Sequence, residues 1–354
     1  MAKRKKLVGE QASIINVIIL VGLFALFVIY ITDSNLRAEI VGMIGNANNI
    51  ETTSTTTASI TTITASTTTT TLQLENETAG YYELKLYALS IINDERAKRN
   101  LSSVALSDNN AAQEHAEDMI KYYYLSHWDS YGRKPYMQYT DNNGLYGMSQ
   151  NAAWSGFFER TSFAKKVNPK ASIEYLTNAM IYDDAGSDWG HRDNILNPTR
   201  THVSLGIAYD DINFAFVQNF EDIYINWKKP ITNEKGVISM SGSLTQQDLK
   251  PQQIAIFYDA DPKPMNHSAL LNTPHSYDAG NYVASVLPPG YIVLKGKRIA
   301  ANEWSVSNSD FKISFDTKKM ITNGTGVYTL HLQAADKNDT IYDLTDYSIT
   351  IGSV

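Results

Sequence analysis

Side chains that can do chemistry gather in three polar segments of the sequence. These are Ser126-His127-Trp128-Asp129, Ser149-Gln150-Asn151, and the run from Gly190 to Pro198, which contains His191. Imidazoles are common ligands of zinc and similar divalent ions. Ser126 and His127 do not form a nucleophile pair, because adjacent residues rarely face one another and no third member is evident. The two histidine segments are therefore the first candidates for a functional site.

Other polar residues have ordinary structural interpretations. His115 is surrounded by Gln113, Glu114 and Glu117 on a polar helix face, so we expect it to be solvated. His202 begins a predicted strand and has no acidic neighbour, which favours a structural role. Asp210 is followed by a second aspartate, but Asp and Asn are common in hairpin turns. None of these residues predicts a site.

The composition excludes several classes of function. The 354 residues contain no cysteine, which rules out disulfides, thiolate metal sites and cysteine nucleophiles. The net charge is −7, and we find no cluster of Lys and Arg beyond the first six residues. Phosphate backbones are bound by such clusters, so a nucleic-acid partner is not expected.

Helices and a strand pair must position the polar segments. Helical spacing of apolar residues predicts helices over 81–100, over 107–123 with Ser107 as N-cap, and over 172–182. A Gly- and Asn-rich loop is expected from 131 to 147. Residues 203–209 and 214–220 alternate as the strands of a hairpin. The pattern is typical of a mixed α/β layered domain.

After residue 228 the pattern changes to short alternating runs separated by turns. The runs are 237–243, 253–258, 282–286, 311–315, 327–333 and 347–351. We find no convincing helix among them. Residues 229–354 therefore predict a β-sandwich of roughly 125 residues, an ordinary size for that architecture. We also expect residues 73–228 to fold independently of it.

The N-terminus predicts a membrane anchor. Lys3, Arg4, Lys5 and Lys6 lie in a basic segment, residues 1–13, before an apolar run at 14–32. A run of roughly 19 residues is long enough for a transmembrane helix. Positive charge stays on the cytoplasmic side, which places the later residues outside the cell in a single-pass arrangement. A cleaved signal peptide is the alternative, but no small-x-small cleavage site follows the run.

A flexible stalk is expected at residues 33–78, because 51–72 is almost entirely Thr with Ser, Ala and Ile. Such a run outside a membrane also suggests O-glycosylation. Five Asn-x-Ser/Thr sequons are candidates for N-glycosylation. They begin at Asn76, Asn100, Asn266, Asn323 and Asn338.

The three polar segments, together with Ile92-Asn93-x-x-Arg96, resemble the CAP superfamily of cysteine-rich secretory, antigen 5 and pathogenesis-related proteins. The order of SH-, GEN- and GHRxNIL-like segments is most similar to the prokaryotic type. The resemblance covers residues 79–228 and implies an α-β-α sandwich, so the fold expected is α+β with an added C-terminal β domain.

The resemblance also implies a central cavity lined by two histidines and two acids. The histidines match His127 and His191, while one acid falls at Gln150 and the other at Asp183, with Asp184 as an alternative. Two imidazoles near a carboxylate make a partial site for zinc or another divalent ion, with water in an open position. Gln150 is a poor zinc ligand and cannot act as a general base. The alternative is that both histidines hydrogen-bond loops around the cavity.

Three functions remain open. The resemblance implies a cell-surface module that binds a small lipid, a peptide or a partner protein through the cavity. The second alternative is a metal-assisted, protease-like hydrolase using His127 and His191, which Gln150 disfavours. The third is a structural component of the envelope or an adhesion protein. We assign no catalytic residue from the sequence.

Overall fold

The computed structural model describes residues 66–157, 166–291 and 297–352, with side chains described from Gly80 onward. By contacts the chain divides into residues 1–65 and a second unit, 66–354, which contains all of the described residues. The transmembrane helix predicted at 14–32 and most of the predicted stalk lie outside the described residues. Within the described part of the chain, no helix is long and apolar enough to cross a membrane.

A four-stranded sheet forms the centre of the first domain. Its order is β1-β3-β4-β2, so among the described strands β2 lies at an edge and pairs with β4 alone. The predicted hairpin is present as β3 and β4, and Asp210 Oδ1 accepts hydrogen bonds of 2.8 Å from the backbone nitrogens of Ile212 and Asn213 in the turn. The bounds are Ala105–Leu106 for β1, Gly147–Ser155 for β2, His202–Tyr209 for β3 and Phe214–Asp222 for β4.

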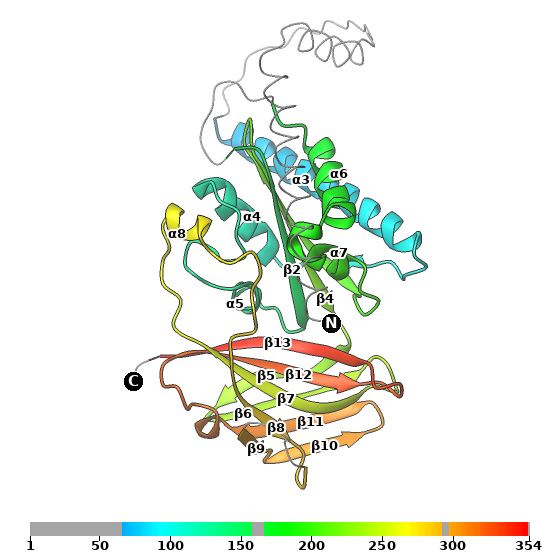
Figure 1. Ribbon diagram of the computed structural model, residues 1–354, viewed down its shortest axis with the longest axis vertical. Coiled ribbons are helices and arrows are strands. Elements are labelled where there is room, and N and C mark those ends of the chain that lie inside the picture. Colours follow the sequence, from blue (N-terminus) through cyan, green and yellow to red (C-terminus); the bar gives the residue numbers. More distant parts are fainter. Residues whose placement is uncertain (1–65, 158–165, 292–296, 353–354) are drawn as a thin grey trace, which may run out of the picture. The chain divides into compact units, whose positions relative to one another are not determined.

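Helices cover both faces of this sheet (Figure 1). On one face α4 packs its alanines and Met119 against Ala215 and Val217 of β4. On the other face α3 and α6 pack against the phenylalanines of β4. The mixed α/β prediction is confirmed. The bounds are Ser66–Ala97 for α3, Ala111–Tyr122 for α4, Pro135–Asp141 for α5, Pro169–Tyr182 for α6, Ala185–Ser187 for the 3-10 turn η1 and Gly190–Ile195 for α7.

Two expected helix features are wrong. Ser107 is not an N-cap: its backbone nitrogen donates to the Val203 carbonyl at 2.9 Å, so the chain is still extended there, and Asn109 Oδ1 instead accepts from Ala111 at the start of α4. The expected loop at 131–147 contains α5, whose first residue is Pro135, a favoured residue at that position.

The flexible stalk was expected to extend to residue 78, but the backbone of residues 66–78 is helical and belongs to α3. The later turns of α3 pack through Leu84, Ala88 and Ile92. Extending an existing helix fixes one residue for each new hydrogen bond, so extension costs far less than nucleation.

His115 is buried rather than solvated, with 1% of its surface exposed. It lies on the buried face of α4 with Ala111, Ala112, Ala116 and Met119, a helical stripe spaced at three and four residues. Its Nε2 lies 2.8 Å from the carbonyl oxygen of Ser126. Burial lowers the pKa of His115, so the fold holds a neutral ring there.

Two further sheets form the second domain around one apolar core, which includes Ile238, Ile256, Phe315 and Leu330. One sheet has the order β10-β11-β6-β5 and the other β13-β12-β7-β8-β9. All six runs expected as strands lie in strands. The bounds are Ile225–Glu234 for β5, Val237–Leu244 for β6, Lys250–Asp259 for β7, Asn281–Leu287 for β8, Lys297–Ala300 for β9, Glu303–Ser307 for β10, Asp310–Asp316 for β11, Gly326–Ala335 for β12 and Ile341–Ile351 for β13, with a 3-10 turn η2 at Thr317–Lys319.

Strand β5 runs through the boundary expected at 228/229, and in the described part of the chain it pairs with β6. The boundary between the two domains stays a prediction. The segment 260–280 between β7 and β8, here called the arm, contains the short helix α8, His267–Leu271. The arm lies beside α4 of the first domain (Figure 1), where Leu270 joins the cluster of Ala112, Ala116 and Met119.

Candidate functional site

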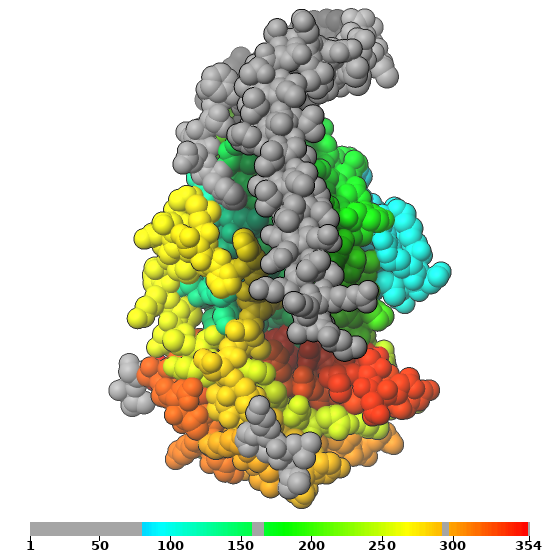
Figure 2. Space-filling model, viewed as in Figure 1, coloured from blue at the N-terminus to red at the C-terminus, as the bar shows by residue number. Residues whose placement is uncertain are grey.

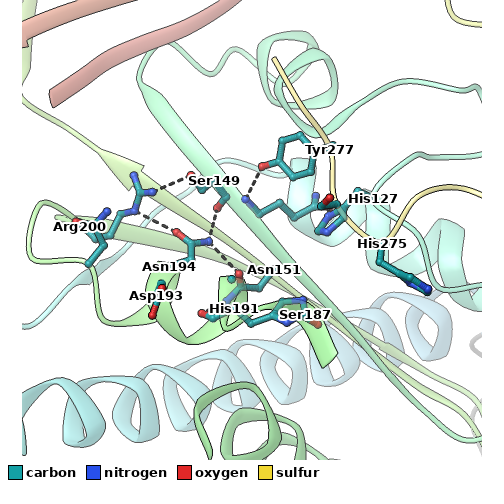
Figure 3. A pocket seen from close by; sticks show the side chains of 14 residues that line it. His127, Ser149, Asn151, Ser187, His191, Asp193, Asn194, Arg200, His275 and Tyr277 are labelled. Atoms are coloured by element: carbon teal, nitrogen blue, oxygen red, sulfur yellow. Dashed lines mark hydrogen bonds between the residues drawn. The ribbon is translucent and has the colours of Figure 1, made fainter. Parts of the chain in front are cut away.

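A pocket of about 350 Å³ lies at the edge strand β2. Residues on α7 and the preceding loop form one wall, β2 forms the next, and the arm forms a third (Figure 3). The lining residues share a polar character. They are His127, Ser149, Gln150, Asn151, Ser187, Gly190, His191, Asp193, Asn194, Asn197, Arg200, His275, Ser276 and Tyr277.

His191 is held by an acid at the start of α7. Its Nδ1 lies 2.7 Å from Asp184 Oδ1, and Asp184 Oδ2 accepts hydrogen bonds from the backbone nitrogens of His191 at 2.9 Å and Arg192 at 3.2 Å. Asp184 thus fixes the ring of His191 and satisfies two free N–H groups of the helix.

Of the two acids expected near the cavity, Asp184 is the one that contacts His191. Asp183 follows the last residue of α6 and its side chain is exposed, and neither acid is among the residues that line the pocket. The chain leaves the helix at this residue, so the next carboxylate, Asp184, is the one directed inward.

His127 is paired with a neutral group. Its Nδ1 lies 2.9 Å from Gln150 Oε1, and a second hydrogen bond joins the ring to the backbone of His275 in the arm. Burial lowers the pKa of His127 to about 4, although the bond to Gln150 opposes this effect. The ring is therefore neutral at physiological pH. The structure brings together His127, Gln150 and His191 from the expected set.

A hydrogen-bond network fixes the wall between β2 and α7. Asn194 Nδ2 donates to Asn151 Oδ1 at 3.0 Å, and Asn151 Nδ2 donates to the His191 carbonyl at 3.1 Å. Arg200 donates to Asn194 at 3.1 Å, to Ser149 at 2.7 Å and to Asp222 at 2.8 Å.

Arg200 and Asp222 form a buried ion pair. Burial raises the pKa of Asp222 to about 6, while the charge of Arg200 acts in the opposite direction. The guanidinium is thus neutralised and bonded on three sides, so it does not make the pocket an anion site.

The donor set does not fit a divalent metal ion. Among the described residues, no group of three or more His, Asp or Glu side chains is arranged to hold one. Gln150 supplies an amide where zinc sites use an anionic or imidazole ligand, and the ring of His127 is already bonded to Gln150 and the arm. The arrangement instead offers hydrogen bonds and one oriented imidazole, His191, which can bind a polar group or accept its proton.

Sequence reasoning missed the arm. His275, Ser276 and Tyr277 line the pocket although they lie in the second domain, and no local pattern signals a contact across more than 100 residues of sequence. His202 does not line the pocket; its Nδ1 lies 3.0 Å from Thr201 Oγ1, and burial lowers its pKa.

Four of the sequon residues have exposed side chains. They are Asn100, Asn266, Asn323 and Asn338, while the side chain of Asn76 is outside the described residues. Glycosylation of all five remains a prediction.

Comparisons with known proteins agree with the resemblance. Residues 89–220 match the model of the cysteine-rich secretory protein family, CAP. A search of curated proteins finds no match. Similar solved structures include the CAP domain of Enterococcal PrgA, with 16% identity and a TM-score of 0.28, covering 39% of this chain and 60% of that one.

Another similar structure is an extracellular protein containing a SCP domain from Bacillus anthracis, with 21% identity and a TM-score of 0.28. That match covers 38% of each chain. In both cases the chain spans less than two thirds of the length of the structure that it matches. The family match therefore covers residues 89–220, where it supports a CAP-like domain.

Proposed function

We propose that this protein is a surface-displayed binding module whose pocket takes a short peptide segment. The observation that carries the proposal is the pocket on the edge strand β2, in which no lining residue has an aliphatic side chain. A peptide offers C=O and N–H groups that match amides, hydroxyls and imidazoles. The backbone nitrogens of Met148 and Gln150 in β2 already donate to Asp346 and Tyr277, so the contacts to a peptide would come from the polar side chains of the lining.

Glycine substitutions provide a direct test. Gly190 lines the pocket, and a Cβ added to it meets nothing within 4 Å, so Gly190→Phe should fill the pocket without straining the backbone. Gly186 is equally unobstructed but does not line the pocket, which makes Gly186→Phe the matched control. Both variants should unfold at the same urea concentration as the wild type.

The full-length protein in detergent would be mixed with a pool of unmodified tripeptides and studied by saturation-transfer NMR. We expect signals from a subset of peptides with the wild type and Gly186→Phe, and loss of these signals with Gly190→Phe. If extracts of the wild type contain a lipid in stoichiometric amount and extracts of Gly190→Phe do not, the ligand of the pocket is a lipid and not a peptide. Equal peptide signals from all three proteins would overturn the proposal.

Hydrolysis is the second candidate, favoured by one observation, the Asp184–His191 pair at the pocket. An imidazole oriented by a carboxylate is a standard general base. Incubation of the same tripeptide pool should then yield products that His191→Asn does not form. If the peptides stay intact after prolonged incubation, hydrolysis is excluded and peptide binding is the remaining candidate function.

Display at the surface rests on the basic segment 1–13 and the apolar run 14–32. Protease added to intact cells should remove residues 66–354 from the cell-associated protein. Protection of these residues would contradict the proposed orientation, and a mature N-terminus near residue 32 would indicate cleavage rather than anchoring.

A further inference from the structure

The arm encloses a second pocket, of about 600 Å³, between itself and the first domain. We call this cavity the arm pocket. Residues 259–265, which lead to α8, and residues 269–274, which lead away from it, line the cavity together with residues 128–137 of the first domain. Figure 2 shows the arm, in yellow, on the surface of the first domain.

The arm is attached to the first domain at several points around this cavity. Leu270 is 1% exposed and belongs to the core cluster of α4. The hydroxyls of Thr273 and Ser126 lie 2.6 Å apart, and the backbone nitrogen of Met265 donates to the Ser130 carbonyl at 2.8 Å. The walls of the arm pocket are therefore fixed before a ligand arrives, which lowers the entropic cost of binding.

The charged groups of the arm pocket are neutralised or exposed. Lys134 Nζ lies 2.8 Å from Asp259 Oδ1, at the start of the arm, and 2.6 Å from Asp278 Oδ1, near its end. The two other charged residues of the lining, Asp261 and Lys263, have opposite signs and exposed side chains. The arm pocket thus offers no buried charge that would select an anion or a cation.

Apolar side chains make up much of the lining, in contrast to the pocket at β2, where no lining residue is aliphatic. Binding sites for organic groups are mostly apolar and aromatic, with a few polar groups, and have volumes of about 300–1,000 Å³. The arm pocket matches both properties. Its apolar lining includes Trp128, Met137, Pro262, Met265, Ala269 and Pro274.

The apolar lining favours an aromatic ring over an aliphatic group. Trp128 is half-buried and supplies an indole, on which a second ring can pack. Met137 and Met265 supply thioethers, which make favourable contacts with aromatic rings and adapt to their shape. A ring therefore gains contacts that an aliphatic group of similar size does not.

The two pockets share a boundary. His127 lines the pocket at β2 and its neighbour Trp128 lines the arm pocket, while the neighbours His275 and Pro274 are divided in the same way. An extended tripeptide is roughly 10 Å long. That length is enough for one side chain to enter the arm pocket while the adjacent residues lie at the pocket on β2.

We infer that the arm pocket is a second binding site, which takes an aromatic side chain and thereby selects the peptides that the neighbouring pocket holds. Its role in peptide selection rests on the proposed function, whereas the binding of an aromatic group does not. The second domain thus supplies the arm that distinguishes one peptide from another.

Two small compounds test the site on the full-length protein in detergent. N-acetyl-phenylalaninamide carries the ring, and N-acetyl-leucinamide is the aliphatic control. With ¹³C-methyl methionine, the ring of the first compound should shift the methyl signals of Met137 and Met265, while Met240, buried in the core of the second domain, stays unchanged. We expect the phenylalanine compound to bind about fivefold more tightly, because contacts of the ring with the indole and the two sulfur atoms add to the burial that both compounds share. Absence of these shifts, or equal affinity for the two compounds, would overturn the inference.

Two substitutions in α8 show whether the shifts arise in the arm pocket. Ala269 lines the pocket, so Ala269→Phe should fill it and abolish the shifts caused by the phenylalanine compound. Leu271 has an exposed side chain and does not line the pocket, which makes Leu271→Phe the matched control. Equal urea midpoints would show that both variants are folded. Shifts that persist in Ala269→Phe would place the ligand elsewhere and refute the site.

The tripeptide pool separates this inference from the proposed function. The bound subset should consist of peptides that contain Phe, Tyr or Trp, and Ala269→Phe should lose them. If the phenylalanine compound binds in the arm pocket but no tripeptide signal depends on Gly190, the proposed function fails and the aromatic site stands. If tripeptides bind with no preference for aromatic residues, the proposed function stands and the inference is wrong.

Discussion

Asp346 Oδ2, in β13 of the second domain, accepts a hydrogen bond of 2.6 Å from the backbone nitrogen of Met148 in β2 of the first. The other carboxylate oxygen of Asp346 lies 2.6 Å from His331 Nδ1. Met148 precedes Ser149 and Gln150, so the strand that lines the pocket is held from its edge by two elements of the second domain, β13 and the arm. The pocket therefore depends on the packing of both domains.

Removal of the Asp346 carboxylate should destabilise the whole unit. Asp346→Ala leaves the amide of Met148 and the ring of His331 without their partner in a buried position. Removal of one partner of a buried ion pair lowers the free energy of unfolding by about 3–5 kcal/mol. Urea unfolding should show this loss, while Thr350→Ala, an exposed position on the same strand, should change stability by about 0.5 kcal/mol or less. A small loss for Asp346→Ala would mean that the carboxylate does not bridge the domains.

The His331–Asp346 pair predicts a dependence of stability on pH. Burial lowers the pKa of His331, but the charge of Asp346 and a hydrogen bond to it outweigh burial, so the pKa lies above the ordinary 6.5. A raised folded-state pKa gives stability that is fully present below pH 6.5 and is lost as pH rises through the folded value. The difference in unfolding free energy between wild type and His331→Gln should shrink from pH 6 to pH 8.5. A difference that is constant or grows over this range would contradict the assignment.

Sequence patterns within a short stretch predict the elements that form between neighbouring residues, such as the hairpin and the helices. The hairpin of β3 and β4 was predictable because Asp210 and its neighbours form a turn between alternating strands, and α6 was predictable from its apolar spacing. The polar neighbours of His115 favour an exposed position, but His115 also belongs to the helical stripe from Ala112 to Met119, and this stripe is the face of α4 that is buried.

The remaining parts of the site could not be predicted from local patterns. Strand β2 is buried on most of its length and carries no apolar alternation, because Gln150 and Asn151 point into polar surroundings on its two faces. Tyr277 lies 127 residues from Gln150, and the bond between them depends on how two domains pack. Only the family resemblance connected His127 with His191.

Leu270 and Leu271 test whether the arm is part of the core. Leu270 is 1% exposed and packs in the α4 cluster, whereas its neighbour Leu271 is 40% exposed. Leu270→Ala should cost about 2–5 kcal/mol in urea unfolding, the usual range for a buried leucine. Leu271→Ala should cost about 0.5 kcal/mol or less. Equal effects would show that the arm is not docked on α4, and would favour the independent folding expected for residues 73–228.

The contact between Gln150 and His127 predicts the effect of restoring an acid. Gln150→Glu places a carboxylate where the amide oxygen now lies 2.9 Å from Nδ1, and a nearby opposite charge favours the protonated imidazole. The pKa of His127, about 4 in the wild type, should rise by about 1 to 3. NMR titration of the ring protons between pH 3 and pH 8 measures this change. Gln150→Met, of similar size and neutral, should leave the pKa at or below the wild-type value.

The same substitution changes acid stability with a defined sign. The folded-state pKa of His127 lies below the ordinary 6.5, so between pH 6.5 and about 4 the unfolded chain binds a proton that the folded wild type does not. The wild type therefore loses stability as pH falls through this window. In Gln150→Glu the raised pKa of His127 narrows the pH range over which only the unfolded chain is protonated at this residue. The urea midpoint of Gln150→Glu should therefore fall less between pH 6.5 and 4.5 than that of Gln150→Met. Parallel pH profiles for the two variants would mean that residue 150 does not control the charge of His127.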